Sequence, residues 1–305
     1  MDRRERALTE VGTVQEWTGV AGKRVVITGA TGGIGLAAAV ELGRRGARLS
    51  IVARSAQRAD LAVARIRLEA GRDAEPEVLS ADLASQASIR QLAGEILARH
   101  PRVEVLINNA GAINRTRSLT VDGIELTWAV NHLAPFLLTN LLLDRIRGSV
   151  PARIITTSSG AHQGAHIPFD DINLSRGYGG AGFRRYGQSK LANILFTREL
   201  ARRLEGTGVT ANCFHPGFVA TGFNRNNGAL MNFGMSLARP FARKPERGAE
   251  TLVWLADSPE ASGQSGGYFM DRRRVQPSAS ARDPDTARRL WELSEQQTAG
   301  RPAAA

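Results

Sequence analysis

The sequence predicts an α/β protein: a single doubly wound domain with about seven parallel strands and helices on both faces of the sheet. Two observations lead to this prediction. Short apolar runs rich in β-branched residues alternate with longer segments of helical period along the 305-residue chain, which is the pattern of parallel strands joined by helical crossovers. A glycine-rich turn follows the first run and opens a helix, the position that such turns take in doubly wound sheets.

The elements follow in a regular order. Strands are expected over 23–28, 47–53, 76–80, 103–107, 152–157, 209–214 and 267–270, and helices near 34–45, 56–70, 85–99, 119–147, 187–205, 246–257 and 284–298. Two glycine-rich segments without clear period, 160–185 and 217–245, are expected to be functional loops, the second of them a substrate loop. No boundary divides the chain further, so we expect an N-terminal extension over 1–20 and one domain over 21–300.

Composition excludes several classes of protein. With 42% hydrophobic and 23% charged residues the chain is globular and not disordered. It has no run of 18 apolar residues and no apolar stretch behind its charged N-terminus, so we expect neither a membrane span nor secretion, and a cytoplasmic location. A single cysteine, Cys213, excludes an internal disulfide and is interpreted as a small buried hydrophobe.

The formal charge of +11 raises the question of nucleic acid. The 40 basic residues are nearly all arginines, scattered in pairs at expected helix ends or beside acidic residues. A nucleic-acid groove needs basic groups gathered on one surface. We therefore expect no nucleic-acid partner, and the charge is better suited to attracting a polyanionic small molecule.

The glycine-rich turn is the first candidate site. A turn of this kind lets the backbone approach a pyrophosphate, and the helix behind it presents free N–H groups to the negative charge. The alternative, a purely structural turn, is less consistent with the position between strand and helix. The residues expected to cradle the phosphates are Gly29, Thr31, Gly32, Gly33, Ile34 and Gly35.

The end of the second strand indicates which cofactor the turn would bind. Arg54 stands about 20 residues past the glycines, where an acidic residue would select a free ribose 2′-hydroxyl. Its guanidinium, with Arg58 one turn on, suits a 2′-phosphate, so the sequence favours NADP(H) over NAD(H). The alternative is an arginine on a solvated loop, since the chain has many arginines.

Tyr186 and Lys190 form a second candidate site. They stand at positions i and i+4 at the start of an expected helix, so both side chains lie on one face. An ammonium one turn away, together with the positive ring of an oxidised nicotinamide, would lower the phenol pKa toward neutrality. Upstream, Ser159 follows a strand and can hydrogen-bond a substrate oxygen. Taken alone, a Tyr-x-x-x-Lys pair is more often a surface feature than a catalytic one.

The order of the motifs is more specific than any one of them. The glycine turn is followed by Asp82-Leu83, Asn108-Asn109-Ala110-Gly111, Asn131, Ser159, Tyr186 with Lys190, and Pro216-Gly217. This order resembles the classical short-chain dehydrogenase/reductase family over roughly residues 20 to 298. Segments 130–143, 186–196 and 267–271 look most like its retinol-dehydrogenase-like branch, as does the gap of 27 residues between Ser159 and Tyr186.

The resemblance implies a Rossmann fold and roles for particular residues. Tyr186 would be the general acid/base, Lys190 would bind the ribose and lower the tyrosine pKa, Ser159 would hold the substrate oxygen, and Asn131 would serve a proton relay. The resemblance also implies cofactor contacts from Asp82, Leu83, Asn109, Ala110, Gly111, Pro216, Gly217, Val219 and Thr221.

A local argument also points to Asn131. Pro135 has no N–H, so it cannot close the helical hydrogen bond to the Asn131 carbonyl, and that carbonyl would be available to a water leading to Lys190. The alternative is a plain proline kink compensated by solvent. His162 and His166 stand near Asp170 and Asp171, as in some metal sites, but their glycine-containing segment has no helix to align the pair, so no metal is expected.

Together these features predict an NADP-dependent oxidoreductase that moves hydride between the nicotinamide and a carbonyl or secondary alcohol of a small lipophilic molecule. The alternative is a non-catalytic nucleotide-sensing or scaffold protein on the same fold. The aromatic and methionine residues of 217–245 either line a substrate lid or pack it down: Phe218, Phe223, Met231, Phe233, Met235 and Phe241.

Assembly is predicted from the helix that follows Tyr186. Leu191, Ile194, Leu195 and Ala201 form one apolar face, whereas Phe196, Leu200 and Leu204 form another, roughly opposite. The second face predicts a homodimer or a tetramer built from it. The alternative is that this face packs within the same chain.

Overall fold

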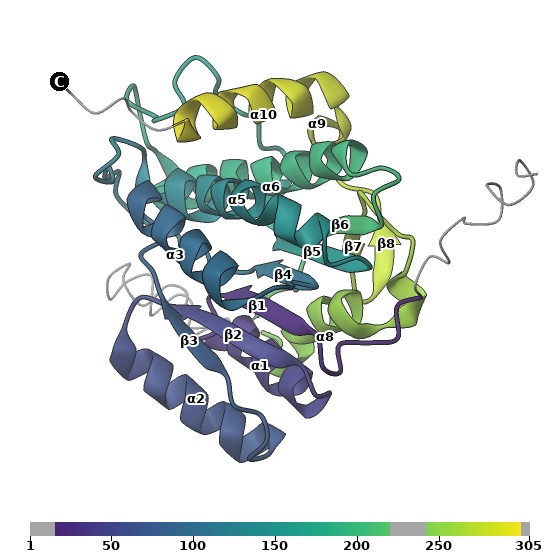
Figure 1. Cartoon of the computed structure of the whole chain (residues 1–305). Coiled ribbons are helices and arrows are strands. Elements are labelled where there is room, and N and C mark those ends of the chain that lie inside the picture. The colour runs from purple at the N-terminus through teal and green to yellow at the C-terminus, as the bar shows by residue number, and fades with distance from the viewer. Residues whose placement is uncertain (1–15, 220–241, 300–305) are drawn as a thin grey trace, which may run out of the picture.

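One mixed sheet forms the middle layer of the protein (Figure 1). The computed structural model describes residues 16–219 and 242–299. The strands are β1 (Arg24–Thr28), β2 (Arg48–Ala53), β3 (Glu77–Ser80), β4 (Val105–Asn108), β5 (Ala152–Thr157), β6 (Val209–Phe214), β7 (Tyr268–Met270) and β8 (Arg273–Val275), in the order β3-β2-β1-β4-β5-β6-β7-β8. The first seven are parallel, which confirms the predicted doubly wound fold.

The eighth strand was missed by the sequence prediction. β8 pairs antiparallel with β7 at the sheet edge, and its three residues are two arginines and a valine. Asp271 and Arg272 make the turn between them, both with positive φ. An exposed edge strand of three residues needs no apolar run, so no hydrophobic pattern marks it.

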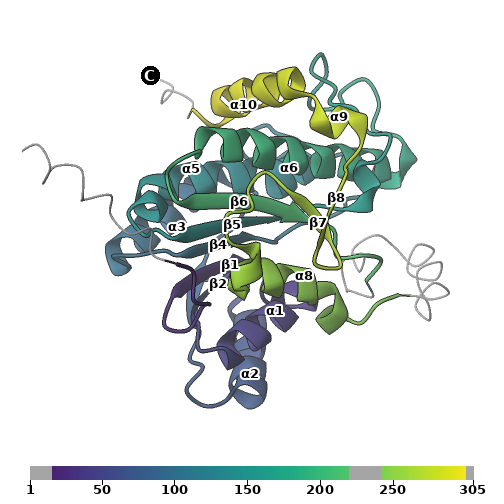
Figure 2. The ribbon, with the colours of Figure 1, turned by 90° about the vertical axis from the view of Figure 1, so that its right-hand side faces the viewer.

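Helices cover both faces of the sheet (Figures 1 and 2). α1 (Gly33–Arg44), α2 (Ala56–Ala70) and α8 (Pro245–Asp257) lie on one face, and α3 (Gln86–Arg99), α5 (Ala134–Arg147) and α6 (Phe183–Arg203) on the other. α9 (Ala279–Arg282) and α10 (Pro284–Thr298) lie outside α6. Val25 and Ile27 pack on the α1 side whereas Val26 packs on the α3 side, as the alternation along a buried strand requires.

The helix expected over 119–147 begins later and is not uniform. Residues Leu119 and Glu125 pair as an isolated bridge around a turn, and α4 (Leu126–Trp128) then leads into a π-helical segment, η2 (Ala129–Leu133), before α5. The Ala134 N–H donates to the Ala129 carbonyl, five residues back. The predicted break in α-helical bonding before Pro135 is therefore confirmed, and it takes the form of a π segment, a feature common at functional sites.

This helical run, Leu126–Arg147, is long and apolar enough to cross a membrane by length and composition, with a hydropathy of 1.3. In the structure, 72% of that window is buried inside the fold. A core helix of a globular domain passes the same test, so the run is only weak evidence of a membrane span.

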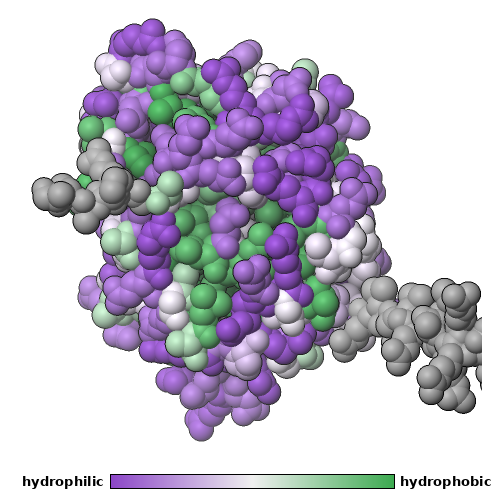
Figure 3. All heavy atoms as spheres, turned by 45° about the horizontal axis from the view of Figure 1, so that its top comes forward, coloured by the Kyte–Doolittle hydropathy of each residue, from purple (hydrophilic) through white to green (hydrophobic). Residues whose placement is uncertain are grey.

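The second apolar face of α6 is covered within the chain. Phe196, Leu200 and Leu204 are buried with Trp291 of α10, and the rings of Phe196 and Trp291 stack with centroids 5.9 Å apart. The expectation that this face is open for a second copy is therefore wrong, because an amphipathic helix near the end of the chain occupies it (Figure 2). Seen from the α10 side, hydrophobic patches stand among hydrophilic residues (Figure 3). The homodimer or tetramer itself stays a prediction.

Candidate active site

The predicted site residues come together where the carboxyl ends of the strands meet. The sheet changes direction between β1 and β4, so the turns after these two strands diverge and leave a crevice between them. A gap at this point, too small to hold a water molecule, is lined by Thr28, Leu83, Asn108, Ala110, Val130, Ala134, Pro135 and Leu138. Two of the residues predicted to contact a cofactor, Leu83 and Ala110, therefore lie close to the same point.

The glycine turn is tightly packed on one side and open on the other. A Cβ added at Gly35 would overlap the Gly29 carbonyl oxygen and the Asn109 side chain, and one at Gly29, where φ is +70°, would lie 2.8 Å from the Ala110 Cα. A Cβ added at Gly32 would meet nothing within 4 Å. The first turn of α1 has no acidic residue and no side-chain cap. The turn thus presents the open, positive helix end that a pyrophosphate needs.

Asn109 braces this turn. Its Nδ2 donates to the carbonyls of Thr28 and Gly29 at 3.1 and 3.3 Å, and its Oδ1 accepts from the Thr157 hydroxyl at 3.2 Å. The Thr28 hydroxyl in turn accepts from the backbone N–H groups of Asn109 and Ala110, both at 3.0 Å. The side chain of Asn109 is therefore committed to holding the ends of β1, β4 and β5 together.

Arg54 stands at the end of β2 and is exposed, as is Arg58 in the first turn of α2. Within 16–219 and 242–299, neither guanidinium takes part in an ion pair. Most other exposed arginines of α1 and α2 pair with glutamates. Both side chains are thus available to an anion beside the glycine turn. Asp82, in contrast, uses its carboxylate to cap its own turn through the Ala84 N–H at 3.1 Å.

The segment after β6 meets the glycine turn from the other side. A Cβ added at Gly248 in α8 would lie 2.7 Å from Val219 and 3.2 Å from Ile34, so these two predicted cofactor contacts lie beside the same point. Arg243 packs over Gly217 and its backbone pairs with Phe218 and Val219. Thr221, and the lid residues from Phe223 to Phe241, lie outside the described residues.

Lys190 is buried beneath the site. Its Nζ donates to the Thr157 carbonyl at 2.9 Å and lies 3.5 Å from where a Cβ on Gly111 would stand. Burial lowers its pKa to about 8. The ammonium is thus a desolvated donor next to the predicted cofactor-binding residue Gly111, and 5.5 Å from the centre of the Tyr186 ring.

Tyr186 lies one turn inside α6, which starts earlier than predicted. Its hydroxyl is hydrogen-bonded to the Ser159 side chain, which favours the phenolate, but burial acts more strongly and raises the pKa of Tyr186 to about 12. The expectation of a lowered pKa does not hold for the protein by itself, because desolvation outweighs the hydrogen bond from Ser159. By itself the protein therefore keeps Tyr186 neutral, as a proton donor to a carbonyl must be.

Asn131 joins three parts of the site. Its Oδ1 accepts from the Ala112 N–H at 2.7 Å, while its Nδ2 donates to the Ala112 carbonyl at 2.8 Å and to the Ser189 hydroxyl at 3.0 Å. The side chain therefore locks the segment after β4 to α6, at Ser189 between Tyr186 and Lys190. Its part in a proton relay stays a prediction.

Two histidines, His162 and His215, lie beside Ser159 and Gly160, a placement that was not predicted from the sequence. His162 donates through Nδ1 to the Ser159 carbonyl at 2.7 Å and accepts through Nε2 from the Ser278 N–H, while its ring packs against Tyr268. His215 lies 3.2 Å from a Cβ built on Gly160, and its Nδ1 is buried without a hydrogen-bond partner among the described residues. The position of His215 directly before Pro216-Gly217 was the available signal.

No group of three metal-binding side chains occurs in the part of the chain that the structure describes. His162 is used in hydrogen bonds to the backbone, and His166 bonds its neighbour Gly164.

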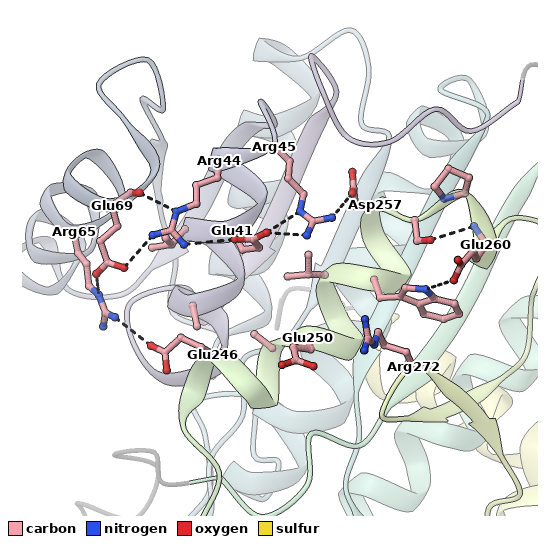
Figure 4. Close-up of a pocket in the computed structure, with 17 residues that line it drawn as sticks. Glu41, Arg44, Arg45, Arg65, Glu69, Glu246, Glu250, Asp257, Glu260 and Arg272 are labelled. Carbon is pink, nitrogen blue, oxygen red and sulfur yellow. Dashed lines mark hydrogen bonds and ion pairs between the residues drawn. The ribbon is translucent and has the colours of Figure 1, made fainter.

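A groove of about 560 Å³ lies elsewhere, between α1, α2 and α8 (Figure 4). Its rim consists of ion pairs, among them Arg45 with Glu41 and Asp257, and Arg65 with Glu69 and Glu246. None of the predicted site residues lines it. Its charges largely neutralise one another, so it has no feature that selects a ligand.

Comparison with known proteins agrees with this geometry. A family model described as short chain dehydrogenase matches residues 23–170 and 172–231. The human protein named retinol dehydrogenase 14 is 44% identical over 294 residues, covering 90% of this chain and 85% of the relative. A Streptomyces protein provisionally named daunorubicin C-13 ketoreductase DnrU is 41% identical over 276 residues, covering 90% of this chain and 92% of the relative.

Solved structures show the same likeness. An uncharacterised protein from Mycobacterium paratuberculosis superimposes with a TM-score of 0.74 at 33% identity, covering 93% of this chain and 98% of that one. An active-site complex of Pseudomonas aeruginosa RhlG with NADP superimposes with a TM-score of 0.66 at 27% identity, covering 84% of this chain and 96% of that one.

Proposed function

The chain belongs to the short-chain dehydrogenase family, in its retinol-dehydrogenase-like branch, and from this premise we propose that it is an NADP-dependent reductase of carbonyl groups on small lipophilic molecules. Oxidation of the matching secondary alcohol is the reverse of the same reaction. The single observation that carries the proposal is the convergence of Ser159, Tyr186 and Lys190 at one sheet edge, with a neutral, hydrogen-bonded Tyr186 hydroxyl among them.

The roles follow from the contacts. Bound NADPH would supply hydride to the carbonyl carbon. The Ser159 and Tyr186 hydroxyls, already hydrogen-bonded to each other, would bind the carbonyl oxygen, and Tyr186 would donate its proton to that oxygen. The Lys190 ammonium would then stabilise the phenolate that remains, since it stands beside the ring. Asn131 would hold the two segments in register through Ala112 and Ser189.

The residues present fit NADP(H). Gly32 faces open space at the start of α1, and the exposed Arg54 and Arg58 supply guanidinium groups for a 2′-phosphate. Structures of relatives described as NADP complexes support the same choice. Gly111, above Lys190, and Gly217 and Val219, near Ile34, would border the remainder of the cofactor.

The proposed substrate class rests on the names of the relatives and on two aromatic residues near the site. Relatives are named retinol dehydrogenase and, provisionally, daunorubicin C-13 ketoreductase. Tyr268 is buried against His162, which bonds the Ser159 carbonyl, and Phe218 is 48% exposed beside Gly217. We also propose that the protein acts in the cytoplasm, which is supported by the burial of its long apolar helix.

The test is an assay of the purified protein with NADPH and a panel of aldehydes, ketones and quinones that includes retinal. We expect consumption of NADPH, followed by its absorbance, with at least one lipophilic carbonyl and a slower reaction with NADH. Tight NADPH binding without turnover of any carbonyl or alcohol would instead favour the non-catalytic nucleotide sensor.

A further inference from the structure

Glu125 and Arg185 form an ion pair in the interior of the protein. Arg185 Nε lies 2.7 Å from Glu125 Oε2, and both side chains are 0% exposed. No other Lys, Arg or His ion pair within 16–219 and 242–299 has both partners fully buried. Arg185 directly precedes Tyr186 in the first turn of α6, and Glu125 caps the helical run that contains Asn131.

The carboxylate of Glu125 fixes the start of the helical run that contains Asn131. It accepts the backbone N–H groups of Thr127 and Trp128, each at 2.9 Å, and the Tyr178 hydroxyl at 3.1 Å. These bonds fix the start of the helical run whose next turn is the π segment with Asn131. The same carboxylate therefore ties Asn131 and Tyr178 to Arg185.

The guanidinium of Arg185 fixes the segments around Tyr186. It donates to the Ile172 carbonyl and to Gln188, and it stacks over Trp128 with 4.4 Å from its carbon to the ring centre. The Asn173 Oδ1 accepts a further bond from the Glu125 backbone N–H at 3.0 Å. The 160–185 segment, which separates Ser159 from Tyr186, is thus held at residues 172, 173 and 178 by one buried pair.

A buried ion pair adds little to the stability of a protein by itself. Taking both charges out of water costs free energy that their attraction often fails to recover, and apolar residues of similar size frequently do as well. What a buried, multiply bonded pair does provide is one defined geometry, because its bonds to several fixed groups can be satisfied together in only one arrangement. In this protein that geometry relates the residues on either side of the proton-transfer site.

We propose that Glu125 and Arg185 are positioning residues, which set Tyr186 against Ser159 by locking α6, the Asn131 helix and the 160–185 segment together. This inference deepens the proposed function and rests on it. Neither residue touches the reacting atoms, so their removal should lower turnover without weakening cofactor binding.

The test compares two double variants, each of which removes an ion pair that contains an arginine of α6. Glu125→Gln/Arg185→Met removes both charges and keeps the side-chain lengths. Glu199→Gln/Arg203→Met is the control, because Arg203 pairs with Glu199 at 2.8 Å and stacks over Trp291 at 4.2 Å, but at the far end of α6. We expect the first variant to lose about tenfold or more in kcat with KM for NADPH within about twofold, and the control to keep its kcat. Equal kcat in the two double variants would overturn the proposal.

A second measurement separates this inference from the proposed function. Amide hydrogen exchange over 160–190 should become faster in Glu125→Gln/Arg185→Met and stay unchanged in the control. If the wild-type protein reduces no carbonyl, the proposed function fails, and exchange still decides whether the pair holds the Tyr186 segment. Unchanged exchange in both variants contradicts the positioning role.

If the double variant does not fold, Arg185→Lys provides the test. Lysine keeps the charge toward Glu125 but cannot reach Ile172 and Gln188 at the same time, since it lacks the planar fork of arginine. We expect a folded protein with lower kcat and unchanged KM for NADPH. A folded Arg185→Lys protein with wild-type kcat would refute the inference.

Discussion

The two sides of the candidate site are built in different ways. On the β1–α1 side the geometry comes from backbone and glycines, with Gly29, Gly32 and Gly35 inside a stretch of seven residues. On the β5–α6 side it comes from buried polar side chains far apart in the chain: Lys190 reaches Thr157, 33 residues away, and Asn131 reaches Ser189, 58 residues away. We expect changes on the first side to alter cofactor binding and changes on the second to alter turnover.

The largest effect is expected on the second side, from Tyr186→Phe. The substitution removes the transferable proton and leaves the ring beside Lys190, so kcat should fall by about 10³-fold while the Kd for NADPH stays near that of the wild type. Steady-state assays together with NADPH fluorescence titration measure the two quantities. A loss of NADPH affinity as large as the loss of rate would contradict the assigned role.

On the first side, Arg54→Asp should change cofactor choice. The carboxylate would repel a 2′-phosphate and accept a hydrogen bond from a 2′-hydroxyl, so the ratio of kcat/KM for NADPH over NADH should fall by about 100-fold. Arg72→Asp is the control, because it makes the same charge change at an exposed residue just beyond the other end of α2. A ratio that Arg54→Asp leaves unchanged would remove Arg54 from the cofactor site.

Alanine substitutions at two glycines of the turn separate an effect on NADPH affinity from an effect on stability. A methyl at Gly32 meets no protein atom, whereas a methyl at Gly35 overlaps Gly29 and Asn109. Gly32→Ala should therefore keep its thermal stability and lose about tenfold in NADPH affinity. Gly35→Ala should lose stability as well, by about 1–3 kcal/mol. Equal NADPH affinity in Gly32→Ala and the wild type would show that the open space is not a phosphate site.

The smallest effect concerns the buried Lys190. Its pKa falls from 10.5 in the unfolded chain to about 8 in the protein. Below pH 8 both states carry the charge and the native state bears the full cost of burying it; between pH 8 and 10.5 only the unfolded state binds the proton, so stability rises. Lys190→Met should therefore be more stable than the wild type at pH 7, and this advantage should shrink by pH 10.

Urea unfolding of both proteins at the two pH values measures this difference. If the difference in unfolding free energy between wild type and Lys190→Met is the same at pH 7 and pH 10, burial of the lysine charge is not what destabilises the wild type.

Prediction from the sequence worked best where neighbours along the chain decide the structure. α10 was predicted over 284–298 and is found at Pro284–Thr298, where Asp283 caps it and Pro284 opens it. α6 was predicted from 187 and begins at Phe183, because the glycines before it hide its first turn. The segment 119–125 was predicted as helix and forms a turn, in which the Thr120 hydroxyl accepts the Asp122 N–H.

Prediction failed where distant residues meet. The apolar face of Phe196, Leu200 and Leu204 suggested that a second copy of the chain packs there. In the structure, Trp291 of the same chain covers this face. Nothing along the chain connects Glu125 with Arg185, 60 residues later, because neither periodicity nor spacing carries that pairing.

The sequence by itself determined the order of strands and helices, the glycine turn and the set of residues at the strand ends, since periodicity, caps and glycine conformations depend on a few contiguous residues. Only the tertiary structure decided how those residues are held and how readily they exchange protons. Burial raises the pKa of Tyr186 and lowers that of Lys190, because it disfavours the charged form of each. Desolvation and packing are properties of the assembled interior, and they depend on every segment that surrounds a side chain.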